Sequence, residues 1–82
     1  MDNHGAPPKV VDAIKRYVDS RLPPGGFVTA VLANDLRESL VRADHINRHY
    51  IREIVTYCWN EIPASCWGSY EKVDMWLRGE TK

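Results

Sequence analysis

Apolar residues recur every three to four positions along most of this chain, the spacing that places them on one face of an α-helix. The first such segment begins at Pro8, and proline is favoured at the first helical position because its missing N–H would have no partner there. This segment predicts a helix over residues 8–21. The run Pro23-Pro24-Gly25-Gly26 ends it, since each proline removes a backbone donor and disfavours helical geometry in the residue before it. The apolar positions of this first segment are Val10, Val11, Ile14, Tyr17, Val18 and Leu22.

The same periodicity predicts three further helices. A second helix covers residues 27–42, and Asp44 is a suitable N-cap for a third, which ends before Pro63. Ser69 can cap a last helix that stops at Gly79. Because no segment alternates with the period of a strand, we predict an all-α fold, a compact bundle of about four short helices.

The length of the chain limits its organisation. Eighty-two residues suffice for one hydrophobic core and are too few for two. Residues 1–7 are mostly polar or Gly/Pro, have no periodic pattern and predict a flexible arm; residues 8–79 predict a single helical domain and residues 80–82 a loose tail. A monomer of this size is marginally stable unless it packs densely or self-associates, so we expect a homo-oligomer.

Charge and hydropathy exclude several classes of protein. Lys and Arg together number 11 and so do Asp and Glu, so the net charge is zero and nucleic acid is not an expected partner. No apolar run approaches the roughly 20 residues of a membrane span, and no basic-then-apolar leader is present. We therefore expect a cytoplasmic protein in which Cys58 and Cys66 are reduced thiols, Cys58 acting as a small buried hydrophobe.

Two features predict a site for a small anion. The loop ending in Gly25-Gly26-Phe27 opens a helix without an acid in its first turn, where backbone N–H groups can converge on a phosphate or carboxylate. A basic face with helical spacing follows it, although a structural turn and an ordinary solvated face are the plainer interpretations. With an aromatic ring added, the candidate ligand-binding residues are Gly25, Gly26, Phe27, Arg42, His45, His49, Arg52 and Trp67.

Aromatic residues cluster in the last third of the chain, at Trp59, Trp67, Tyr70 and Trp76. The plainer interpretation is that they dock the last helix on the core. Alternatively, one or two rings form a subunit interface or a stacking surface. Trp67 is the ring least constrained by helical periodicity, so we expect it to be the exposed one.

The sequence predicts no enzyme. His45 and His49 have the spacing of paired metal ligands, but Ile46 stands where a His-Glu-x-x-His motif needs Glu, and neither cysteine belongs to a Cys-x-x-Cys pair. On one helix Cys58 lies about 13 Å along the axis from His49, too far for a nucleophile and its base. We therefore assign no catalytic residue, metal ligand or cofactor.

The chain resembles small uncharacterised helical proteins encoded by phages and prophages. The resemblance covers about residues 23–77 and implies an accessory gene product acting in a bacterial cytoplasm, of the kind that inhibits host enzymes, regulates phage genes or blunts host defences. It carries over no catalytic or ligand-binding residue. It depends on Gly25-Gly26-Phe27, Ala30-Val31-Leu32, Asn34-Asp35-Leu36, Arg42-Ala43-Asp44, Asn47, Asn60, Pro63, Cys66-Trp67-Gly68-Ser69, Glu71-Lys72-Val73 and Trp76-Leu77.

Three functional hypotheses follow. The first is a homo-oligomeric binding module that sequesters a small anionic ligand, such as a signalling nucleotide, to counter host defence. The second is a protein-interaction module that inhibits a host or phage protein through apolar surface on the third and last helices. The third, a helix-turn-helix DNA-binding regulator, is disfavoured by the zero net charge and by a turn without glycine.

Overall fold

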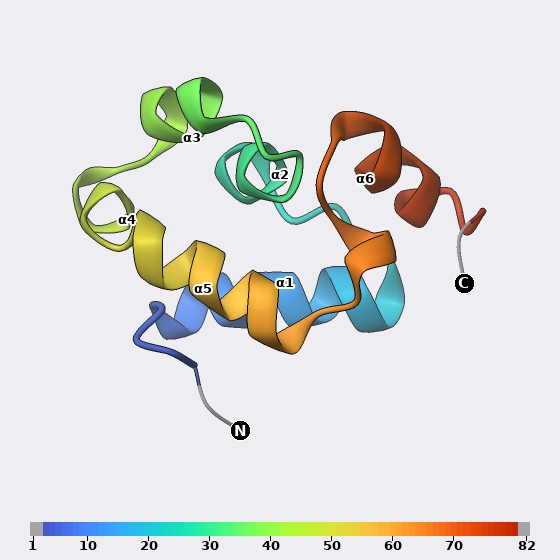
Figure 1. The fold of residues 1–82 in the computed structure, drawn as a ribbon, viewed down its shortest axis with the longest axis horizontal. Coiled ribbons are helices and arrows are strands. Elements are labelled where there is room, and N and C mark those ends of the chain that lie inside the picture. The colour runs from blue at the N-terminus through green and yellow to red at the C-terminus, as the bar shows by residue number, and fades with distance from the viewer. Residues whose placement is uncertain (1–2, 81–82) are drawn as a thin grey trace.

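The computed structural model describes residues 3–80, which are entirely helical apart from turns and loops, with no strand among them. The all-α prediction is confirmed, but the expected number of helices is too low, since these residues form six α-helices, five of them seven residues or longer. None of the helices in this part of the chain has the length and apolar character to span a bilayer. The elements are α1 (Pro8–Ser20), α2 (Gly26–Leu32), α3 (Leu36–Arg42), α4 (His45–His49), α5 (Ile51–Glu61), the 3-10 turn η1 (Ala64–Cys66) and α6 (Tyr70–Leu77) (Figure 1).

The number differs because two predicted helices are each interrupted. The segment 27–42 breaks where Asn34 adopts a left-handed conformation (φ 61°), which asparagine tolerates better than most residues. Asp35 then accepts a hydrogen bond from the Glu38 N–H at 3.1 Å and starts α3. The segment 45–62 breaks at Tyr50, whose φ of −113° and ψ of 16° separate α4 from α5. Apolar periodicity continues across both breaks and therefore does not reveal them.

The predicted helix starts are confirmed at three places. Pro8 opens α1, and Asp44 accepts a hydrogen bond from the Asn47 N–H at 2.7 Å to begin α4. Ser69 accepts one from the Lys72 N–H at 3.1 Å to begin α6. Side-chain caps of this kind satisfy backbone donors that would otherwise lack partners, so the same residues mark helix starts in both sequence and structure.

One core is shared by helices from both ends of the chain. In Figure 1, α5 lies in front of α1, α2 is seen nearly end-on above them, and α6 lies beyond α2 on the side away from α3 and α4. Helix α2 contacts α1, α3 and α6, and it is the most buried element, with Val28, Ala30, Val31 and Leu32 all in the interior. The largest fully buried side chains are Val11, Ile14, Tyr17, Leu32, Ile54, Cys58 and Cys66.

The described part of the predicted N-terminal arm, residues 3–7, contacts the domain. Ala6 belongs to the buried core, and His4 Nε2 lies 2.8 Å from Glu61 Oε2 at the end of α5. At the other end, the Glu80 N–H donates to the Met75 carbonyl at 2.9 Å. Residues 1–2 of the predicted arm and 81–82 of the predicted tail lie outside the described residues.

A buried polar network attaches α1 to the last third of the chain. Tyr17 Oη donates to the Cys66 carbonyl at 2.6 Å, and Trp76 Nε1 donates to the Tyr17 carbonyl at 2.9 Å. Arg21 Nη1 donates to the Trp76 carbonyl at 2.6 Å, while the guanidinium carbon lies 4.0 Å from the centroid of the Trp76 ring. Hydrogen bonds of this kind satisfy polar groups that would otherwise be buried in the core without a partner. The network holds η1 and α6 in fixed positions against α1.

Candidate binding groove

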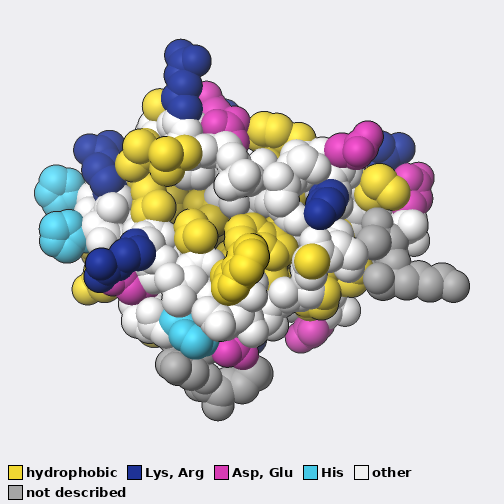
Figure 2. Space-filling model, in the orientation of Figure 1, with side chains coloured by type: hydrophobic (Ala, Val, Ile, Leu, Met, Phe, Trp, Pro, Cys, Tyr) yellow, Lys and Arg dark blue, Asp and Glu magenta, His cyan; other side chains and the backbone are white. Residues whose placement is uncertain are grey.

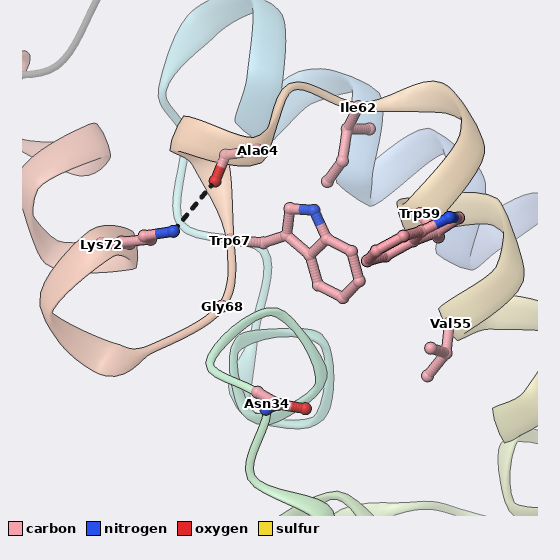
Figure 3. Close-up of a pocket in the computed structure, with 8 residues that line it drawn as sticks. All are labelled: Asn34, Val55, Trp59, Ile62, Ala64, Trp67, Gly68 and Lys72. Carbon is pink, nitrogen blue, oxygen red and sulfur yellow. Dashed lines mark hydrogen bonds between the residues drawn. The ribbon is translucent and has the colours of Figure 1, made fainter.

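A groove of about 550 Å³ opens between the end of α5, the turn η1 and the start of α6 (Figure 3). We call it the aromatic groove, because two indole rings line it. The fixed position of η1 on α1 shapes one wall and the straight helix α5 shapes the other. Its lining residues are Asn34, Val55, Trp59, Ile62, Ala64, Trp67, Gly68 and Lys72.

The two tryptophans of the groove meet edge to face. Their ring centroids are 6.3 Å apart with the planes at 83°, and Figure 3 shows the Trp67 ring extending across the groove toward Trp59. The prediction that Trp67 is the exposed ring is wrong: Trp67 packs partly against the core, whereas Trp59 is 78% exposed. The reason is that the Gly68 N–H donates to the Leu32 carbonyl at 2.7 Å, which draws this loop onto α2.

The rest of the groove is apolar except at its ends. Val55 lies one turn before Trp59 on the outer side of α5, and Ile62 follows that helix. Lys72 is the one charged side chain in the lining, and its Nζ donates to the Ala64 carbonyl at 3.4 Å (Figure 3). The groove therefore suits a bulky apolar group, with a cation at one end.

The apolar surface extends beyond the groove toward α3. A smaller hollow shares Asn34 and Val55 with it and is also lined by Leu36, which is 64% exposed. We call the exposed side chains of Leu36, Val55 and Trp59 the apolar face. Figure 2 shows apolar side chains gathered near the middle of the broad side of the molecule, with charged groups mainly toward its edges.

The other two predicted aromatics face elsewhere. Trp76 is buried in the core, as the plainer interpretation expects. Tyr70 Oη donates to Asp35 Oδ2 at 2.7 Å and so links α6 to the turn between α2 and α3. This hydrogen bond is the main cause of the lowered pKa of Asp35 and the raised pKa of Tyr70. Of the four predicted aromatics, Trp76 thus belongs to the core, Tyr70 links α6 to the turn between α2 and α3, and Trp59 and Trp67 line the groove.

Part of the predicted anion site does come together at the start of α2. A Cβ on Gly26 would lie 2.9 Å from Arg42 Nη1, so the end of the arginine side chain lies directly against the start of α2. The Arg42 Nε, however, donates to Glu38 Oε2 at 3.0 Å, so a carboxylate already faces this cation. Gly25 precedes the helix with φ 93°, and Phe27 packs against the core.

The remaining predicted ligand residues lie apart from that point. His45 and His49 line a hollow on α4, whereas the break at Tyr50 places Arg52 on α5, where its Nη2 donates to Glu53 Oε2 at 3.2 Å. Trp67 lies in the aromatic groove, whose lining contains none of the other predicted residues. The structure therefore distributes the predicted set among four places: the start of α2, the hollow on α4, the first turn of α5 and the aromatic groove.

The two cysteine thiols are buried in an environment that disfavours the reactive thiolate. Cys58 and Cys66 are both free and buried, and burial raises the pKa of Cys58 to about 12 and also raises that of Cys66. Because the thiolate is the nucleophile, neither side chain is activated at neutral pH. Among residues 3–80, no group of three or more His, Cys, Asp or Glu side chains gathers to hold a metal ion.

The sequence-based site omitted Val55 and Trp59, the two residues that dominate the groove. A signal for them exists, since Ile54 and Cys58 mark the buried side of α5 and Val55 and Trp59 follow each by one position. No protein-family model, curated protein or solved structure matches the chain. The candidate surface is therefore defined by its geometry: an apolar groove with a projecting indole at its edge.

Proposed function

We propose that this protein is a non-enzymatic protein-interaction module and that the aromatic groove is its binding surface. The observation that carries the proposal is the exposure of Trp59, which projects from the last two turns of a helix beside a second indole. Exposed apolar patches on small domains mark interaction sites, and tryptophan is the residue type most enriched among interface hot spots.

Burial of the Trp59 ring by a partner would contribute a large binding free energy for one side chain. A tryptophan buries roughly 150–250 Å² on contact, which at about 25 cal/mol per Å² corresponds to on the order of 3–5 kcal/mol for a ring as exposed as this one. The backbone of α5 is already ordered, so little further chain entropy is lost on binding. A single ring can therefore act as the anchor of an interface.

The chemistry of the groove describes its occupant: a protein surface that presents a bulky apolar side chain, with an acidic residue favoured near Lys72. In the setting that the phage resemblance implies, such a partner would be a bacterial or phage protein. The small-anion hypothesis has weaker support, because Glu38 already pairs with Arg42 and the other basic side chains lie apart from it. The groove itself contains a single cation.

A displayed peptide library tests the proposal. Random helical peptides selected on the immobilised full chain should converge on sequences with a bulky apolar residue, and binding to W59A should be at least about 10-fold weaker. The matched control is I46A, which removes another largely exposed apolar side chain, on α4 and outside the groove. Peptides that bind W59A as tightly as the unmodified protein would refute the proposal.

A further inference from the structure

Resting on the proposed function, we infer that the occupant of the aromatic groove is Trp59 of a second copy of this chain. The two copies form a symmetric dimer in which each indole inserts into the groove of the other. The inference deepens the proposal, because it names the protein surface that the groove binds.

The groove and the projecting ring share one face of one molecule. Trp59 stands at the edge of a recess whose other walls are Val55, Ile62 and Trp67 (Figure 3). A two-fold axis brings the same patch of both subunits together, so a symmetric interface must be complementary to itself. A knob beside a hole meets this requirement, because the knob of each copy faces the hole of the other.

The groove has room for one large apolar side chain. The groove holds about 550 Å³ and is walled by Val55, Ile62 and Trp67, so it admits a bulky apolar side chain such as an indole. It therefore accommodates one projecting ring with its neighbours, and Trp59 is the most exposed large apolar side chain in the described part of the chain.

The area of the face suits a small dimer. The molecule is a slab of 33 × 28 × 17 Å, and its broad side is comparable to the roughly 800 Å² that each partner contributes to a standard interface. Figure 2 shows that side, with an apolar centre and a more polar margin, which is the usual composition of an interface. Val55 and Leu36 extend the apolar contact from the groove toward α3.

Charge does not oppose the association. The chain has 11 basic and 11 acidic residues, so two copies approach without net repulsion at neutral pH. Lys72 is the one charged side chain of the groove lining and lies at its end, hydrogen-bonded to the Ala64 carbonyl. The centre of the interface thus buries no unpaired charge, which would otherwise be costly.

Sedimentation equilibrium of the full chain tests the inference. Between about 5 and about 500 µM, the average mass should rise from the 9.4 kDa of the monomer toward twice that value, with a dissociation constant on the order of 10–100 µM. W59A should weaken the dimer at least about 30-fold, and W59F, which keeps a smaller ring, should fall between the two. I46A, checked like the others for an unchanged circular-dichroism spectrum, should dimerise as the unmodified chain does.

The outcomes separate this inference from the proposed function. A chain that stays monomeric over the whole range, or a dimer unaffected by W59A, overturns the symmetric dimer. If a monomeric chain still selects peptides that depend on Trp59, the groove binds a different protein and the proposed function stands. If the chain is monomeric and also selects no Trp59-dependent peptide, both fail.

Discussion

Replacing Tyr17 with Phe removes one buried hydrogen bond and almost no volume. Tyr17 is fully buried, and its hydroxyl donates to the Cys66 carbonyl at 2.6 Å. Burial is the main cause of its raised pKa, so the phenol stays protonated and keeps donating across the neutral range. In the Y17F variant the carbonyl loses this donor while remaining in the interior.

The expected cost follows from that geometry. Leaving a buried acceptor without its partner costs about 1–3 kcal/mol, whereas the net value of an ordinary exposed bond is smaller. A domain of this length has a total stability of roughly 4–12 kcal/mol, so the loss is a substantial part of it. At about 4–8 °C per kcal/mol, a loss of about 2 kcal/mol lowers the Tm by roughly 8–16 °C.

Urea denaturation followed by circular dichroism measures this loss directly. The matched control is Y57F, because the Tyr57 ring is also buried and its hydroxyl makes no hydrogen bond to the residues that the structure describes. The midpoint should fall clearly in Y17F and little in Y57F, with an unchanged m-value in both. Equal effects of the two substitutions would refute the assigned role of the Tyr17–Cys66 bond.

Three further predictions concern the turn between α2 and α3, the loop before α2, and the thiols. Because the pKa of Asp35 is lowered in the folded protein, its carboxylate stabilises the fold above the unfolded pKa, and this stabilisation is lost as the pH falls through the folded pKa. The D35N variant should therefore show a flatter decline in urea midpoint between about pH 6 and about pH 2 than the unmodified chain. An equally steep decline would contradict this. G25A should lower the free energy of unfolding by about 1–3 kcal/mol, because φ 93° and ψ 164° belong to a region open essentially to glycine and no atom within 4 Å would compete with the new methyl group; an unchanged urea midpoint would show that the loop relaxes. Cys58 and Cys66 should react with a disulfide reagent at pH 8 only as fast as the protein opens, since both are buried and burial raises both pKa values; rapid labelling of the folded chain would contradict their placement.

Helix starts were predictable because short polar side chains decide them locally. Asp44 and Ser69 each accept a backbone N–H three residues later, an interaction that depends on the residue type and its position alone. Pro8 acts in the same local way through its missing donor. These signals need no knowledge of the rest of the fold.

The breaks and the groove were not predictable from the same signals. The interruption at Asn34 depends on a left-handed residue inside a continuous apolar pattern, and it allows Leu36 to turn toward solvent. The exchange of roles between Trp59 and Trp67 depends on a contact from Gly68 to Leu32, which are 36 positions apart. Periodicity describes which face a residue occupies on its own helix but not what covers that face.

The polar contacts between α1 and the end of the chain have a consequence for biosynthesis. His4, Tyr17 and Arg21 find their partners at Glu61, Cys66 and Trp76, 49 to 57 positions later in the sequence. These hydrogen bonds therefore cannot form until the ribosome has synthesised the residues from Glu61 to Trp76. A nascent chain halted before η1 lacks the partners of Tyr17 and Arg21, so we expect proteases to cleave it faster than a chain that extends past α6.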